Sequence, residues 1–267
     1  MNDTILENPR APRVKRAAAL ARKKDRREQQ RFLVEGPQAV RELLAHRPEL
    51  AEVVYATMGT EPWQHEIDRL ASDAGVRIDR ATDEVLAAMA DTVHPQGVVA
   101  VARMPETALS GALAGARLVA ILHEIRDPGN AGTVLRAADA AGADAVVFAG
   151  ESIDPFHPKV VRSTTGSLFH LPVALADSLA AALDIARTAG LTSYAADVHG
   201  DDLVESRAEL ARPVAWVFGN EAHGLTEADR ALTDRALKLP IYGAAESLNL
   251  ATAASVLLYE TAFAQRA

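Results

Sequence analysis

Three short segments in the second half of the chain combine glycine and asparagine with charged residues that could do chemistry. They are residues 127–136 (DPGNAGTVLR), 217–225 (VFGNEAHGL) and 239–250 (LPIYGAAESLNL). Each lies where a predicted strand gives way to a loop or a helix. Ligands of α/β proteins bind at such strand ends. Taken together, the three segments predict one composite binding site.

The first segment places glycines at the entrance of a predicted helix that carries Arg136. A glycine-rich strand-to-helix turn exposes backbone N–H groups to an anion, and Arg136 is predicted to face the same crevice. Such a turn taken alone is more often only structural. The chain contains neither the Gly-x-Gly-x-x-Gly pattern of dinucleotide-binding folds nor the Gly-Lys-Ser/Thr of a P-loop, so both common nucleotide sites are disfavoured.

The second segment begins with a buried strand that ends at Phe218. Gly219 then lets the backbone approach a flat ligand, and Glu221 is predicted to orient Arg136 or a hydroxyl group. His223 is interpreted as a surface loop residue rather than a base.

The third segment leads into the last predicted helix, from Leu248 to Gln265. Ser247 is a candidate N-cap for that helix, since serine side chains accept hydrogen bonds from the first free N–H groups. Asn249 is a poor helix former inside a first turn, which indicates a role for its side chain.

The elements that must position these segments fall into four parts. We predict a basic N-terminal extension (1–30, helical over 12–30), a small α/β domain (31–103), a linker (104–116) and a larger α/β domain (117–267). The apolar run Val214 to Phe218 is typical of a strand in a parallel sheet covered on both faces. We also predict a loop around Pro155 and Pro158 and a strand from Ser167 to His170.

The net charge of −8 conceals a strong asymmetry. From Arg10 to Arg31 there are ten Lys and Arg against Asp25 and Glu28, a local charge of +8. This asymmetry favours contact with a polyanion such as RNA, although a solvated helix face is the alternative. The basic side chains assigned to RNA are Arg13, Lys15, Arg16, Arg22, Lys23, Lys24, Arg26 and Arg27, together with Arg136.

The composition is that of an ordinary globular protein, with 49% apolar and 24% charged residues. The absence of cysteine excludes disulfides and thiolate metal sites. No apolar run reaches the roughly 18 residues that suggest a membrane span. We therefore expect a cytoplasmic protein with no membrane partner and no metal.

In this order and at this spacing, the three segments resemble the signature motifs of the SpoU (TrmH-like) RNA ribose 2′-O-methyltransferases of the SPOUT superfamily. The part before the linker resembles the L30e-like substrate-binding domain found in that family. The resemblance implies an α/β fold with a parallel sheet and a deep C-terminal trefoil knot. It also implies S-adenosylmethionine bound in the knot, and homodimers in which the partner subunit completes each site.

The same resemblance implies roles for individual residues that stand at the matching positions of the three motifs. The implied catalytic and ribose-binding residues are Asn130, Arg136, Glu221, Ser247 and Asn249. The implied cofactor-binding residues are Phe218, Gly219, Leu239, Ile241, Leu248 and Asn249. The chain departs from the family pattern at Ala222, where glycine is frequent, and at Ala251, where serine is common, which puts only local loop detail in doubt.

The resemblance implies methylation of a ribose 2′-hydroxyl in RNA. Ribosomal RNA (23S) is preferred to transfer RNA because the small N-terminal domain is common in members that act on rRNA. A resistance rRNA methylase of the same fold and a non-catalytic RNA-binding assembly factor are the alternatives. The general base stays unassigned, and Arg136 is interpreted as a cationic clamp on phosphate and on the developing alkoxide.

Overall fold

The structure is a computed structural model that describes residues 5–267. Its contacts divide these residues into two compact units. The first contains the described residues up to Glu106 together with Phe156–His170, and the second contains Thr107–Pro155 and Leu171–Ala267. The segment Phe156–His170 thus packs with the first unit, although its place in the sequence lies within the predicted domain 117–267. The predicted domain boundaries as a whole stay a prediction.

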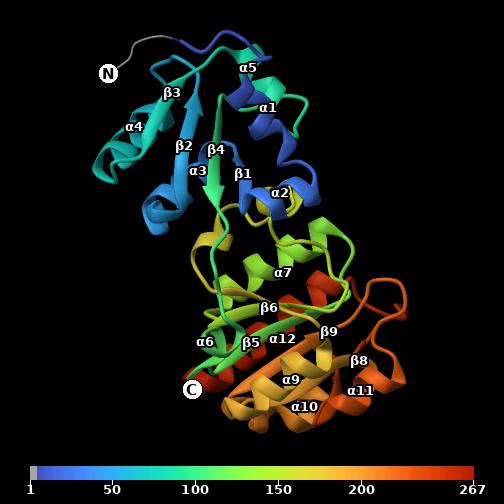
Figure 1. The fold of residues 1–267 in the computed structure, drawn as a ribbon. Helices are drawn as coiled ribbons and strands as arrows, with labels where there is room; N and C mark the ends of the chain where they lie inside the picture. Colours follow the sequence, from blue (N-terminus) through green and yellow to red (C-terminus); the bar gives the residue numbers. More distant parts are fainter. Residues whose placement is uncertain (1–4) are drawn as a thin grey trace. The chain divides into compact units, whose positions relative to one another are not determined.

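The first unit is built on a four-stranded sheet (Figure 1). The strand order is β1-β4-β2-β3, with β4 antiparallel to both β1 and β2, and β3 parallel to β2. Its elements are α1 (Pro12–Ala19), α2 (Lys23–Gln29), β1 (Arg31–Glu35), α3 (Pro37–His46), the 3-10 helix η1 (Pro48–Leu50), β2 (Ala51–Ala56), α4 (Pro62–Asp73), β3 (Arg77–Arg80), α5 (Asp83–Met89), β4 (Val98–Arg103), α8 (Pro158–Ser163) and the 3-10 helix η2 (Ser167–Phe169).

The second unit is built on a six-stranded sheet of order β10-β8-β9-β5-β6-β7. Every pairing in it is parallel, which confirms the prediction from the apolar strands. Its elements are α6 (Leu109–Leu113), β5 (Leu118–His123), α7 (Pro128–Ala141), β6 (Ala145–Ala149), β7 (Val173–Ala176), α9 (Leu179–Thr188), β8 (Thr192–Asp202), α10 (Leu203–Ser206), the 3-10 helix η3 (Arg207–Ala211), β9 (Val214–Phe218), α11 (Glu227–Leu232), β10 (Arg235–Lys238) and α12 (Leu250–Arg266).

Helices cover both faces of this sheet because its strands are apolar on both sides. Val147 and Val217 pack with Leu183 of α9 in one core cluster. On the opposite face, Trp216 is fully buried and its indole N–H donates to the Thr261 hydroxyl of α12 at 2.8 Å. Figure 1 shows α7 and α12 running side by side on that face. This arrangement puts the carboxyl ends of β5 and β9 next to the N-termini of α7 and α12.

The structure corrects the single helix predicted over residues 12–30. The chain leaves α1 after Ala19 and begins α2 at Lys23, with Arg22 in an extended conformation. Arg26 is fully buried and donates to the carbonyls of Leu20 and Ala21 at 2.9 Å each. Its guanidinium caps free carbonyls at the end of α1, a role that basic side chains take at helix C-termini. The prediction that Arg26 binds RNA is therefore wrong.

Three other elements differ from the sequence prediction. Residues 167–169 form a 3-10 helix rather than a strand, because Gly166 turns the chain at φ +106°, and the edge strand follows as β7. The loop predicted around Pro158 contains α8, since proline is favoured in the first turn of a helix. The last helix begins at Leu250 rather than Leu248. The threading of the chain through a knot stays a prediction.

No helix within residues 5–267 is both long enough and apolar enough to span a membrane.

Candidate active site

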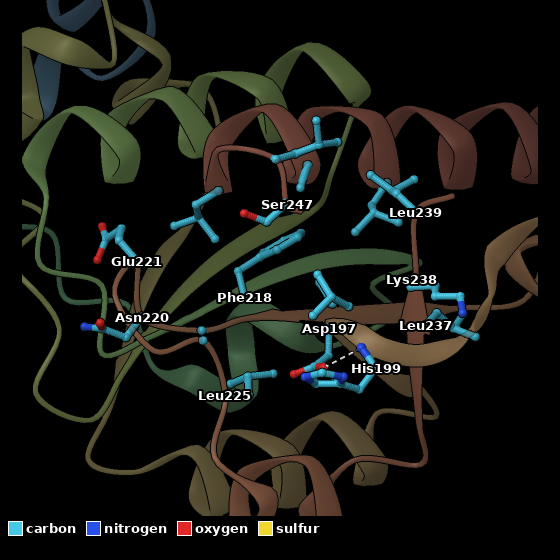
Figure 2. A pocket seen from close by; sticks show the side chains of 18 of the residues that line it. Asp197, His199, Phe218, Asn220, Glu221, Leu225, Leu237, Lys238, Leu239 and Ser247 are labelled. Atoms are coloured by element: carbon cyan, nitrogen blue, oxygen red, sulfur yellow. Dashed lines mark hydrogen bonds between the residues drawn. The ribbon is translucent and has the colours of Figure 1, made fainter. Parts of the chain in front are cut away.

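A cavity of about 400 Å³ lies in the second unit, next to the second and third glycine-rich segments (Figure 2). It is lined by residues 196–199 of β8, by 218–225, by Arg230, by 237–239 and Ile241, and by Ser247, Leu248, Leu250, Ala253 and Leu257. Figure 2 shows Asn220 and Glu221 on one side of the view and Asp197 with His199 on the other. This volume suits a ligand the size of a nucleoside derivative. The cavity therefore joins two of the three sequence motifs in one site.

Gly219 is required by the way the chain folds back after β9. A Cβ atom at this position would lie 2.6 Å from the carbonyl carbon of Gly224 and 2.7 Å from the backbone nitrogen of Leu225. The turn is closed by the N–H of Gly224, which donates to the carbonyl of Asn220 at 2.8 Å. Any side chain at position 219 would have to push backbone away from the cavity wall. The glycine thus allows the chain to fold back tightly beside the cavity.

The loop that follows β9 ends at Thr226, the N-cap residue of α11. Thr226 and Asp229 exchange hydrogen bonds in a capping box. The pKa of the Asp229 carboxyl lies below its ordinary value: burial raises it, but hydrogen bonds from the hydroxyl and N–H of Thr226 more than offset that effect. Asp229 therefore remains an acceptor that holds the loop at neutral pH.

A chain of hydrogen bonds links all three motifs. The carboxylate of Glu221 accepts from the backbone N–H groups of Arg126 and Asp127 at 3.1 and 3.0 Å and from Asn130 Nδ2 at 3.4 Å. Asn249 Nδ2 in turn donates to Asn130 Oδ1 at 3.2 Å. Glu221 therefore orients the turn before α7 and the amide of Asn130, and not the guanidinium of Arg136.

Asn249, and not Ser247, is the N-cap of α12. Its Oδ1 accepts from the N–H groups of Ala251 and Thr252 at 2.9 and 3.3 Å, so the prediction of a Ser247 cap is wrong. Because Asn249 closes the helix with its oxygen, its nitrogen is left to bind Asn130. Ser247 lines the cavity instead.

The polar residues of β8 and α11 were missed by sequence reasoning. Asp197, His199 and Arg230 line the cavity, and Arg230 Nη1 bonds Asp197 Oδ2 at 3.0 Å and the carbonyl of Leu225 at 2.9 Å. None of them belongs to a glycine-rich segment. Asp197 and His199 reach the cavity because β8 pairs beside β9, and Arg230 reaches it from α11. No local pattern indicates either placement.

Arg136 stands apart from the cavity. It is exposed on α7, and it does not line the pocket. Within residues 5–267 its guanidinium forms no hydrogen bond or ion pair with another side chain or carbonyl. The predicted approach of Arg136 to the crevice is thus not seen in the described residues.

Apart from the buried Arg26, the N-terminal side chains assigned to RNA fall into two groups. Arg13, Arg22 and Lys24 pair with Asp79, Asp25 and Glu28 at 3.1, 2.6 and 3.7 Å. The other group is exposed and forms no side-chain ion pair within the described part of the chain; it consists of Lys15, Arg16, Lys23 and Arg27. We call this second group the basic patch.

Both parts of the chain match known protein families. Residues 117–259 match the SpoU rRNA Methylase family, and residues 11–100 match the MRM3-like substrate binding domain. The chain is 34% identical over 256 residues to the 23S rRNA (guanosine(2553)-2'-O)-methyltransferase RlmP of Bacillus subtilis (strain 168), which covers 95% of this chain and 97% of that protein. The solved structure of the SpoU methyltransferase AviRb from Streptomyces viridochromogenes in complex with AdoMet is similar with a TM-score of 0.81 and 30% identity, covering 96% of this chain and 98% of AviRb.

A second solved structure, the AdoMet bound rRNA methyltransferase from Sinorhizobium meliloti, has a TM-score of 0.81 and 28% identity, with 97% of each chain covered. The fold is thus that of methyltransferases solved with S-adenosylmethionine bound, and S-adenosylmethionine is the cofactor of this enzyme class. The chain belongs to the SpoU rRNA methylase family. The family and the enzyme class predicted from the three motifs, an S-adenosylmethionine-dependent RNA methyltransferase, are confirmed.

Proposed function

We propose that this protein methylates a ribose 2′-hydroxyl of 23S rRNA. The observation that carries the proposal is the hydrogen-bonded chain Glu221–Asn130–Asn249, which ties the three motifs together beside one cavity. The target class is supported by the Bacillus subtilis relative, named for guanosine methylation of 23S rRNA, and by a Streptomyces viridochromogenes relative, named for uridine methylation and 38% identical over 173 residues. With such a substrate, the cytoplasm is the proposed location.

The cavity has the properties that S-adenosylmethionine requires. Gly219 presents bare backbone to the cavity, and Leu239, Ile241 and Leu248 supply apolar contacts. The cofactor supplies an electrophilic methyl group to the reaction. Phe218 lines the same cavity from the end of β9. We propose these residues, with Asn249, as the cofactor-binding set.

Methyl transfer to a hydroxyl needs an aligned oxygen and the loss of its proton. Alignment of two reactants can lower a barrier by about 7–11 kcal/mol. Asn130 is hydrogen-bonded to Glu221 and Asn249 caps α12, so we assign both to positioning of the ribose, together with Ser247 of the cavity. A guanidinium stays protonated in proteins. Arg136 is therefore proposed as a cation that binds the target phosphate and stabilises the developing alkoxide.

We propose further that the protein is a homodimer in which the partner brings Arg136 to the cavity. The supporting surface is a stripe on α12 made of Val256, Tyr259 and Phe263, which are 41%, 38% and 58% exposed. Their i, i+3, i+7 spacing puts them on one helix face. The Tyr259 hydroxyl bonds the carbonyl of Ala140, one turn from Arg136 on α7. A second copy that covers this apolar stripe would lie next to Arg136.

The double variant Val256→Glu/Phe263→Glu is expected to be monomeric and to lose methylation, because four charges would be buried in each dimer. Light scattering coupled to size exclusion measures the mass, and the variant should still unfold cooperatively. Val204→Glu is the matched control, since Val204 is 61% exposed on α10 outside the stripe. A dimer of unchanged stability in the double variant would contradict the proposed interface.

The basic patch is proposed to contact the RNA backbone. Changing Lys15, Arg16, Lys23 and Arg27 to alanine should weaken rRNA binding and lower the slope of log K against log salt by up to about 3, at roughly 0.7 per phosphate contact. A filter-binding titration at several salt concentrations measures both.

The control for the basic patch removes the same charge from exposed arginines that already pair with carboxylates: Arg69, Arg77, Arg187 and Arg207. If this control flattens the salt dependence as much as the patch variant does, only net charge matters and the patch is not a contact surface.

The function itself is tested by mapping ribose methylation. Comparing rRNA and tRNA from cells with and without the gene should reveal one 2′-O-methylated nucleotide in 23S rRNA that depends on the gene. A gene-dependent site found only in tRNA would replace the proposed substrate. If no site changes and the purified protein does not bind S-adenosylmethionine, the chain is a non-catalytic RNA-binding factor.

A further inference from the structure

Two histidines and a glutamate of the first unit bring three polar atoms close together. Glu42 and His46 lie one turn apart on α3, and His170 follows the 3-10 helix η2. Glu42 Oε2 lies 3.2 Å from His46 Nε2 and 3.1 Å from His170 Nε2. The two imidazole rings meet edge to face with their centroids 4.5 Å apart. Residues 124 positions apart in sequence thus place three metal-binding atoms within 4.8 Å of one another.

We propose that Glu42, His46 and His170 bind a divalent transition-metal ion such as Zn²⁺. Zinc binds histidine nitrogen and carboxylate oxygen at about 2.0–2.2 Å in a tetrahedron, which separates neighbouring ligand atoms by roughly 3.3–3.5 Å. The two observed oxygen–nitrogen distances are within a few tenths of an ångström of that spacing. No metal was expected from the sequence, which lacks cysteine; His170 comes next to α3 only in the folded chain.

The carboxylate of Glu42 is held in place by two side chains that bond its other oxygen, Oε1. Gln38 Nε2 donates to Oε1 at 2.8 Å, and the guanidinium of Arg41 bonds the same atom. Hydrogen bonds of this kind orient the ligands of metal sites. Both bonds are made to Oε1, so Oε2 is the oxygen that faces the two histidines.

The backbone is shaped to bring His170 to α3. Gly166 has φ +106°, and a Cβ atom there would lie 2.7 Å from Glu42 Cβ. Only glycine therefore allows the turn before η2 to approach the helix this closely. The side chain of Glu42 is 9% exposed, while those of His46 and His170 are 51% and 27% exposed. A metal ion would thus have protein on one side and room for water on the other, and it would fasten η2 to α3.

Zinc binding is tested on the full-length, untagged protein after removal of metal with a chelator. Calorimetric titration with Zn²⁺ at pH 7.5 should give one ion per chain. His46→Ala and His170→Ala should each weaken binding at least about tenfold, since even residues that only orient a ligand contribute roughly 10–100-fold. His65→Ala on the exposed face of α4 is the matched control and should bind as the parent does.

A second measurement needs no variant. Co²⁺ added to the metal-free protein should give the intense visible absorption of four- or five-coordinate cobalt, and Zn²⁺ should abolish it. No binding, the weak spectrum of hexahydrated cobalt, or unchanged affinity in both histidine variants would overturn the proposal. In that case the three side chains form only a hydrogen-bonded cluster.

Discussion

Replacing Arg136 by alanine is expected to abolish methyl transfer and to leave S-adenosylmethionine binding unchanged. The guanidinium is exposed on α7, outside the cavity, so its removal should not alter the cavity or the core. Loss of one preorganised donor to a developing negative charge typically costs about 10²–10³-fold in kcat, and loss of the phosphate contact adds to this. Single-turnover methylation of rRNA measures the rate, and calorimetry measures cofactor affinity.

The variant Arg136→Lys partly separates the two proposed roles of Arg136, phosphate binding and stabilisation of the developing alkoxide. Arg136→Lys keeps the positive charge but loses the planar fork that binds phosphate at two points. We expect activity between those of the alanine variant and the parent. Near-normal turnover by Arg136→Ala would exclude Arg136 from the chemistry altogether.

Replacing Gly219 by alanine is expected to abolish cofactor binding, and methylation with it. The new methyl group would meet the backbone of Gly224 and Leu225 at 2.6–2.7 Å, and backbone cannot move aside as a flexible side chain does. The turn that forms the cavity wall must therefore open. Calorimetric titration with S-adenosylmethionine should show no measurable binding, while circular dichroism should show the parent's secondary structure.

Gly243→Ala is the matched control for this prediction. Gly243 lies in the third motif, but nothing is within 4 Å of a Cβ atom placed there, and its φ is not positive. Alanine at position 243 should leave cofactor affinity within about twofold of the parent, a difference of only ~0.4 kcal/mol at 1.4 kcal/mol per tenfold. Equal affinity of Gly219→Ala and the parent would mean that the cofactor does not use this cavity.

Mixing the two inactive variants tests whether Arg136 acts on the partner's cavity. In a mixed dimer, the intact cavity of the Arg136→Ala subunit would face the intact Arg136 of the Gly219→Ala subunit. Random exchange makes half of the dimers mixed, and each would hold one complete site, so about a quarter of the activity should return. No recovery after verified exchange would place Arg136 and the cavity of the same subunit in one site.

The local sequence alone was sufficient to predict those elements whose structure depends on their own residues. The apolar strand Val214–Phe218 was predicted within the observed bounds, and the glycines of the second motif correctly marked a backbone turn. Arg26 shows the limit of such signals. A run rich in lysine and arginine predicts an exposed helix face. Nothing in this run distinguishes Arg26, whose guanidinium is buried against two carbonyls, from its exposed neighbours.

The chain itself therefore specifies its family, its parallel sheet and the residue types of its three motifs, because these depend on periodicity and on short segments. Only the tertiary structure decided which side chains meet. It paired Glu221 with Asn130, and Asn130 with Asn249, across 91 and 119 residues, and it brought Asp197 and Arg230 into the cavity. Such contacts follow from the order of strands in the sheet, and strand order is a property of the whole packed core rather than of any local pattern.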